Sequence, residues 1–252
     1  DHKSGRTGTA SVEAIATYIR DKGFSVEWVL ETHAHADHLT AAPYLKAALG
    51  ARIAIGEGIR KVQENFQPIF NLKDLATDGS QFDHLFADGD TFAIGGISGR
   101  VMNTPGHTSD SVTYVIGDAA FIGDTLFAPD YGTARVDFPG GDAKLLYQSI
   151  HRLFGLPAET RPFLGHDYPP EGRSEIPMFT VGQQRADNIH IHDGVSEAEY
   201  VAMREARDAK LSMPALIIPS VQVNIRAGNL PPPEDNGVSY MKVPVNMLGR
   251  AL

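Results

Sequence analysis

Apolar residues recur every three or four positions between residues 12 and 19, and Gly23 follows where a helix would end. A largely apolar run over residues 24–31 then predicts a buried strand. A second helical pattern of apolar residues follows over 40–49, and a second strand pattern over 51–55. Helix followed by strand, twice over, predicts an α/β layered architecture.

The pattern changes after residue 82, where short apolar segments alternate with turn signals. Asp88-Gly89-Asp90 and Gly95-Gly96 are typical of tight turns between strands. We therefore expect an antiparallel meander, built from the segments 84–86, 91–94, 97–102, 111–116 and 119–122.

The second half of the chain returns to helical periodicity. Its leucines and isoleucines predict a helix over 142–154, and residues 161–164 have the pattern of a short strand. Ser196 followed by Glu199 has the spacing of a capping box and opens a charged helix. Residues 215–225 fit either a strand or a short helix.

The chain has 252 residues, enough to bury a substantial core. Hydrophobic content of 42% and charged content of 21% are ordinary for a soluble globular protein. We expect a single domain over 1–252, with a core at about 10–170 and a C-terminal extension at about 171–252 packed on it.

Charge and cysteine content narrow the choice of partners. A formal net charge of −9 argues against a nucleic-acid partner, whose phosphates need a basic surface. No apolar run approaches the length of a membrane span, so we expect no membrane partner and a cytoplasmic location. The mitochondrial matrix is the alternative if a transit segment was removed. Because there are no cysteines, any metal must be held by histidine and carboxylate.

The densest polar motif directly follows the strand predicted at 24–31. His33, His35, Asp37 and His38 form the pattern His-x-His-x-Asp-His. At about 3.3 Å per extended residue, His33 and His35 project to the same side of the chain and can converge on one ion. His38, three residues after His35, projects to the other side of the chain. One short loop can therefore address two neighbouring metal positions.

Three later motifs also place a metal-ligand type after an apolar strand. They end on His107 in a Pro-Gly-His turn, on Asp124 in a Gly-Asp pair, and on His166 in a Gly-His pair. Strand ends and the loops beyond them are where rigid scaffolds gather site residues. We expect these residues to meet the histidine loop.

The order of these motifs resembles the metallo-β-lactamase superfamily over about residues 24–168. The resemblance implies an αββα sandwich, with two mixed β-sheets face to face, helices outside and metal in the cleft at one edge. Members normally begin with further strands, so we expect either that the chain is truncated here or that its first strands were lost in processing. The matching residues are His33, His35, Asp37, His38, His107, Asp124 and His166.

A finer resemblance is to the persulfide dioxygenase branch, which includes the ethylmalonic encephalopathy protein. It is carried by residues 132–138, 165–168, 180–185 and 219–228. This tail does not resemble the helical glutathione-binding domain of glyoxalase II.

In that branch, the resemblance implies one Fe(II) per chain, held by the catalytic residues His33, His107 and Asp124. Two histidines and a carboxylate on one face leave positions open for the substrate sulfur and O₂. The implied reaction converts glutathione persulfide and O₂ to sulfite and glutathione. The remaining polar residues would then support these ligands or hold a second metal: His35, Asp37, His38, His166 and Asp167.

The alternative is a glyoxalase II-like hydrolase of S-acylglutathione thioesters with two zinc ions or mixed metals. A metal-bound hydroxide would attack the thioester. The ligand list alone leaves both activities open, and the branch motifs favour the oxygenase. An inactive scaffold is disfavoured, because no ligand position is missing. In the hydrolase, Asp124 would bridge one metal on His33, His35 and His107 and another on Asp37, His38 and His166.

Two residues are candidates for substrate binding. Arg135 fits a glutathione carboxylate, and an ion pair with Asp137 or Asp130 is its alternative. Tyr168 would hydrogen-bond the substrate or pack at the sheet edge. The sequence leaves the oligomeric state open, with a homodimer as one option.

Overall fold

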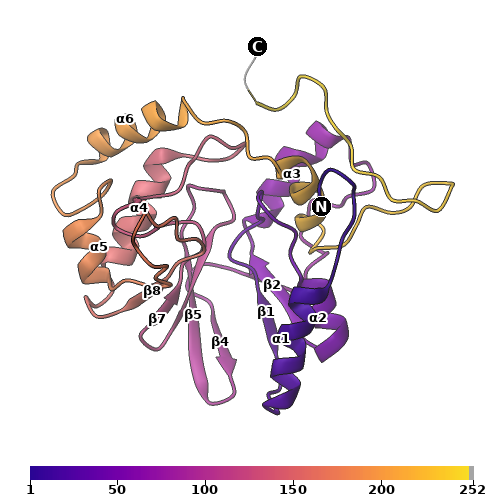
Figure 1. The fold of residues 1–252 in the computed structure, drawn as a ribbon, viewed down its shortest axis with the longest axis horizontal. Helices are drawn as coiled ribbons and strands as arrows, with labels where there is room; N and C mark the ends of the chain where they lie inside the picture. Colours follow the sequence, from indigo (N-terminus) through magenta and orange to yellow (C-terminus); the bar gives the residue numbers. More distant parts are fainter. Residues whose placement is uncertain (250–252) are drawn as a thin grey trace.

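The computed structural model describes residues 1–249 and confirms two sheets with helices outside them (Figure 1). The first sheet has parallel pairing in the order β1 (Trp28–Leu30), β2 (Arg52–Gly56), β3 (His84–Phe86). The second sheet is mixed, with antiparallel pairs from β4 to β7 and a parallel pair of β7 with β8. Its strands are β4 (Thr91–Ile94), β5 (Ile97–Asn103), β6 (Val112–Ile116), β7 (Ala119–Phe121) and β8 (Arg161–Phe163).

The prediction that the meander begins at residues 84–86 is wrong. β3 pairs in parallel with β2, with His84 opposite Ala54, and the turn at Asp88–Asp90 carries the chain into the other sheet. The turn residues indicate that the chain reverses, but they do not specify which neighbour each strand pairs with. Burial decides it here, because Phe86 is enclosed between the sheets together with Phe92.

Seven helices lie outside the sheets within residues 1–249. Figure 1 shows α1 and α2 beside β1 and β2, and α4, α5 and α6 beside the second sheet. The expected capping box at Ser196 is present, residues 217–224 form a helix, and α3 and α5 were not predicted. No helix in the described part of the chain is long and apolar enough to cross a bilayer. The helices are α1 (Ala10–Asp21), α2 (Ala42–Leu49), α3 (Ile59–Phe70), α4 (Ala143–Phe154), α5 (Val181–Asp187), α6 (Glu197–Asp208) and α7 (Ile217–Asn224).

The C-terminal segment contributes to the core on both sides of the sandwich. Val221 and Ile225 pack with α3 and the first sheet, whereas Ile191 and Tyr200 pack with α4 and the second sheet. Burying these side chains stabilises the fold by removing apolar surface from water. The segment after residue 171 is therefore built into both halves of the fold, and it reaches the edge where the histidine loop lies.

Candidate metal centre

The loop after β1 is held in place by buried hydrogen bonds. The Ala34 N–H donates to the Asp110 carboxylate at 2.8 Å, and the Val112 N–H donates to the Thr32 carbonyl at 2.8 Å. From α7, the Asn224 side chain donates to the carbonyls of His35 and His38, both at 2.8 Å. Sequence reasoning did not identify Asp110 or Asn224. Asn224 lies within the 219–228 motif that carries the finer resemblance, which was the available signal.

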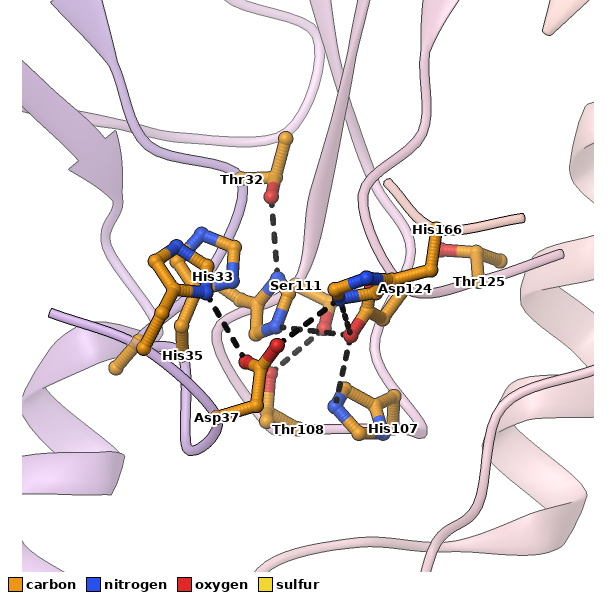
Figure 2. A network of polar contacts seen from close by, with 12 residues as sticks. Thr32, His33, His35, Asp37, His107, Thr108, Ser111, Asp124, Thr125 and His166 are labelled. Carbon is orange, nitrogen blue, oxygen red and sulfur yellow. Dashed lines mark hydrogen bonds and ion pairs between the residues drawn. The ribbon is translucent and has the colours of Figure 1, made fainter. Parts of the chain in front are cut away.

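Three of the predicted ligands converge at this edge. His33, His107 and Asp124 are buried, with relative exposures of 1%, 6% and 8%. Nε2 of each histidine lies 3.8 Å from the Asp124 carboxylate, and one ligand atom from each residue falls within 4.8 Å of the others. Figure 2 shows the three side chains pointing toward one another from separate strand ends.

The orientation of these rings fits metal binding. His107 Nδ1 lies 2.7 Å from the Arg135 carbonyl, which only accepts, so Nδ1 carries the proton and Nε2 presents its lone pair. His33 Nδ1 contacts the Thr32 hydroxyl at 3.1 Å, which leaves its Nε2 toward the cluster. Burial lowers the pKa of His33 well below its usual value, which favours the neutral, ligating form.

Two buried atoms of the cluster have no hydrogen-bond partner in residues 1–249. They are His33 Nε2 and Asp124 Oδ1. Leaving such atoms unsatisfied costs about 1–3 kcal/mol each, and more where the group is charged. A divalent transition metal on two neutral imidazoles and a carboxylate would satisfy them. The residues present therefore fit the metal that the resemblance implies.

A second group adjoins the first and shares Asp124. Asp37, Asp124 and His166 have ligand atoms within 4.8 Å of one another. His166 Nε2 lies 3.1 Å from Asp37 and 3.6 Å from Asp124. His38 lies at the exposed rim, with Nδ1 3.2 Å from Asp37. A carboxylate common to two neighbouring groups is the arrangement that a bridged metal pair requires.

His35 is directed toward a residue that sequence reasoning missed. Its Nε2 lies 3.6 Å from the carboxylate of Glu31, which also accepts a hydrogen bond from Thr40. Burial alone lowers the pKa of His35, but the hydrogen bond and charge of Glu31 outweigh it, so the pKa is raised. His35 is absent from the group formed by His33, His107 and Asp124, but it forms a third potential metal group with Asp37 and His38, and its Nδ1 has no hydrogen-bond partner in residues 1–249.

Asp167 lies outside all three potential metal groups found in the described residues. Its carboxylate instead forms a two-pronged ion pair with Arg173, at 2.6 and 2.7 Å, and accepts the Ile176 N–H at 2.8 Å. Arg173 also pairs with Asp130 at 2.7 Å. Asp167 therefore fixes the loop that carries Tyr168, and a role for it in supporting a ligand or a second metal stays a prediction.

A cavity of about 320 Å³ opens from the metal groups, a size within the range of small-molecule sites. Tyr168 lines it and packs on Tyr131, with ring centroids 4.7 Å apart. Burial raises the pKa of Tyr168 to about 12, so its hydroxyl is protonated at neutral pH.

Arg135 also lines the cavity, but its guanidinium pairs with Asp137 at 2.6 and 2.7 Å and donates to the Ser212 carbonyl at 3.0 Å. The ion pair that the sequence left open is thus present, and substrate binding by Arg135 stays a prediction.

Comparison with known proteins agrees with this geometry. The family model of the Metallo-beta-lactamase superfamily matches residues 4–166. The chain is 55% identical to the "Beta-lactamase hydrolase-like protein" of Xylella fastidiosa, covering 98% of this chain and 57% of that protein. It thus spans little more than half the length of that relative. It is 49% identical to "Glyoxylase B2" of Dictyostelium discoideum, over 97% of this chain and 85% of that protein.

More distant relatives include a named dioxygenase. The chain is 29% identical to mitochondrial "Persulfide dioxygenase ETHE1" of Mus musculus, over 86% of this chain and 76% of that protein. A crystal structure of ETHE1 from Myxococcus xanthus superposes with a TM-score of 0.71 at 30% identity, covering 87% of this chain and 85% of that one. These likenesses extend past the histidine motifs into the C-terminal segment, because residues 1–170 alone make up a smaller share of the chain.

The turn before His107 generates a test of how rigidly the site is held. Gly106 has φ +141°, and a Cβ there would overlap the Leu146 backbone at the start of α4. Gly106→Ala should therefore displace His107 or α4, costing about 1–3 kcal/mol of stability and lowering bound metal per chain. Melting temperature and metal content measure the two effects.

Gly117→Ala is the matched control, because Gly117 also has a positive φ, +60°, but no atom lies within 4 Å of its added Cβ. This control should lose some stability from backbone strain while keeping its metal. Equal metal content in the two variants would contradict the close-contact argument.

Proposed function

The chain belongs to the metallo-beta-lactamase superfamily, and from this premise we propose that it is a non-haem iron persulfide dioxygenase that oxidises glutathione persulfide. The coarser assignment, a metal-binding enzyme of this superfamily, is supported by the family match and the buried histidine and aspartate cluster. The choice of reaction within the superfamily is the proposal.

The observation that carries the proposal is the make-up of the buried donor group. His33, His107 and Asp124 form a set of two imidazoles and one carboxylate. His35 is not part of this set: its Nε2 lies 3.6 Å from Glu31, and its ligand atoms group with Asp37 and His38. Such a set is typical of non-haem Fe(II) oxygenases, because it leaves other metal positions open. A binuclear hydrolase would need His35 as a third histidine beside His33 and His107.

The likeness to ETHE1 is consistent with this choice without deciding it, because "Beta-lactamase hydrolase-like protein" and "Glyoxylase B2" are more similar and cover 98% and 97% of the chain. It covers 86% of the chain for the mouse protein and 87% for the Myxococcus structure, so it includes much of the C-terminal segment. That segment supplies Asn224, which holds the histidine loop through two carbonyls. The likeness therefore extends beyond the ligand motifs into the segment to which Asn224 belongs.

The proposed reaction balances without any further reactant. One persulfide, one O₂ and one water give one thiol, one sulfite and two protons. The outer sulfur loses four electrons, and O₂ gains four. Iron, when bound by His33, His107 and Asp124, supplies the redox site at which sulfur and O₂ react.

The protein's own contribution is to position the substrate and limit access of water. The cavity wall next to the ligands is aromatic, with Phe127 and Tyr168 packed edge to face at a centroid distance of 5.7 Å. On the other side Phe138 packs edge-on against the His107 ring, with centroids 5.2 Å apart. Holding two reactants together in such a pocket lowers the entropic part of the barrier.

A thioester hydrolase is the second candidate, because one observation favours it. Asp124 belongs to two adjacent groups, and the second of these, with Asp37 and His166, would suit another metal. "Glyoxylase B2" among the more similar relatives points the same way. In that enzyme two metals would share Asp124 and lower the pKa of a bound water that attacks the thioester.

One comparison tests the proposal against this alternative. Purified protein should contain close to one iron per chain and consume O₂ with glutathione persulfide, releasing sulfite. The same preparation should hydrolyse S-lactoylglutathione poorly. Two zinc ions per chain, together with rapid thioester hydrolysis and no persulfide-dependent O₂ uptake, would overturn the dioxygenase.

Removing a ligand should have a large effect. His107→Ala deletes one of three proposed protein ligands, so it should abolish both iron binding and O₂ uptake. Iron analysis and an oxygen electrode give the two readouts. His192→Ala, which removes an exposed imidazole elsewhere in the chain, is the control and should retain both. Undiminished iron in His107→Ala would refute the ligand assignment.

Changes at the adjoining group should be milder. His38→Ala and His166→Ala should keep their iron and retain measurable oxygenase activity, reduced by about 10–100-fold, because these residues orient the ligands. Loss of half the bound metal from either variant would instead favour the binuclear hydrolase. Metal content measured alongside activity separates the two results.

A further inference from the structure

The cavity has a second wall, formed by residues far from the metal motifs. Thr133 lies on the loop after Asp124, and His190, Arg204 and Arg207 come from the C-terminal segment, the last two from α6. None of these residues is needed to hold the metal. Their side chains face the same cavity of about 320 Å³ as His107 and Asp124.

His190 presents a hydrogen-bond donor into this cavity. The Thr133 backbone N–H donates to His190 Nδ1 at 3.0 Å, so Nδ1 is unprotonated and Nε2 carries the hydrogen of the neutral ring. The side chain is buried, with 7% relative exposure, and Nε2 has no hydrogen-bond partner in residues 1–249. An unpartnered buried donor at a cavity wall is unfavourable unless a ligand or an ordered water satisfies it, so this donor is available to a ligand that displaces water.

The His190 ring is fixed in this orientation by its surroundings. It lies directly over Gly132, whose φ is +102° and where a Cβ would overlap the ring. The Asn188 side chain accepts the His190 N–H at 3.0 Å and donates to the Gly132 carbonyl at 3.1 Å. Burial, with Arg207 and Arg204 nearby, lowers the pKa of His190 to about 4, so the ring is neutral at pH 7. The site is thus built before any ligand arrives.

The three arginines of the cavity differ in how far their charges are neutralised. Arg204 is buried, pairs with Asp208 and donates to the Thr133 carbonyl at 3.1 Å. Arg135 pairs with Asp137. Arg207 lines the cavity from an exposed position, and no ion pair joins it to an acidic residue between 1 and 249. It is therefore the cavity cation whose charge remains available to a ligand.

We propose that His190 and Arg207 form a carboxylate-binding subsite for the part of the substrate distant from the reacting sulfur. The inference rests on the proposed function, since the carboxylate it assigns to this subsite is one of the two carried by the glutathione portion. Arg207 supplies the charge, and His190 supplies a fixed neutral donor. The same glutathione portion occurs in the persulfide and in the thioester, so the subsite does not depend on which of them reacts.

The first test measures binding without any reaction. S-Methylglutathione, which can be neither oxidised nor hydrolysed as these substrates are, should bind the metal-loaded wild-type protein in calorimetry. Arg207→Ala should weaken that binding by about 10–100-fold, the usual effect of losing a charge-assisted hydrogen bond. Arg207→Lys should recover part of the loss, because it restores the charge without the planar fork.

Lys210→Ala is the matched control. It removes one positive charge just beyond the same helix, from an exposed residue that does not line the cavity. If the overall field of the protein attracts the ligand, this variant will lose as much affinity as Arg207→Ala, and the subsite is wrong. Unchanged binding in Lys210→Ala, together with the loss in Arg207→Ala, supports it.

The second test uses two persulfides. Arg207→Ala should raise the KM for glutathione persulfide with iron content unchanged, and should matter far less for 2-mercaptoethanol persulfide, which has no carboxylate. Equal losses on both substrates would overturn the subsite, because they indicate damage to the reaction centre. Arg135→Ala measured in parallel should affect KM less than Arg207→Ala, since Asp137 already neutralises Arg135.

A third test addresses the neutral donor. His190→Phe keeps a ring of similar size but removes Nε2–H, and it should also weaken S-methylglutathione binding. Melting temperature identifies any variant that is unfolded by the lost Thr133 contact, and the Arg207 variants carry the test in that case. Unchanged binding in both Arg207→Ala and a folded His190→Phe overturns the subsite.

Failure of this subsite is distinguishable from failure of the proposed function. If wild-type protein binds S-methylglutathione through Arg207 but shows no persulfide-dependent O₂ uptake, the reaction is wrong and the subsite stands. If O₂ uptake occurs and the variants bind S-methylglutathione as tightly as wild type, the reaction stands and the subsite is wrong.

Discussion

The edge of this sandwich buries polar atoms that the protein alone leaves unsatisfied, and much of the surrounding structure serves to hold them there. His33 Nε2 and Asp124 Oδ1 have no hydrogen-bond partner among residues 1–249. The Nδ1 atoms on the other side of the two rings are fixed, that of His33 by the Thr32 hydroxyl and that of His107 by the Arg135 carbonyl. Orientation by such outer contacts is how proteins set the tautomer of a metal-binding histidine. A bound cation would offset the cost of burying these atoms, which couples metal binding to stability at this edge.

The C-terminal segment does two different things for the site. Through Asn224 it fixes the backbone of the histidine loop, and through His190 and α6 it forms the far wall of the cavity. Tyr200 and Arg204 both hydrogen-bond Thr133, which links α6 to the loop that follows Asp124. Changes in this segment would therefore alter the ligand loop and the substrate pocket separately, and the superfamily motifs alone do not specify either contribution.

Most of the fold and the metal groups could be predicted from the sequence because their signals are local. The histidine motif, the Gly-Asp pair and the Gly-His turns lie at strand ends, and the structure brings them together. Pairing partners are not local, so β3 was placed in the wrong sheet. α3 has buried apolar residues at helical spacing and α5 begins with a capping box, so both had a local signal that was not used. Asp110 and His190 act through residues distant in sequence, Ala34 and Thr133, and no local pattern marks them, whereas Glu31 lies only four residues before its partner His35.

The sequence also does not show which positive charge in the cavity is available to bind an anion. A net charge of −9 hides the fact that the cavity contains three arginines, and the sequence alone pointed to Arg135 because of its position after Asp124. In the fold, Asp137 and Asp208 neutralise Arg135 and Arg204 at short range. An ion pair that is already formed offers little net attraction to a second anion, because the two fields largely cancel. Recognition of an anionic substrate therefore depends on which cation lacks an acidic neighbour, and this is a property of the packed structure. Arg207 meets that condition within residues 1–249. It supplies the charge of the proposed subsite, and the neutral donor of His190 in the same cavity wall supplies a hydrogen bond of fixed orientation.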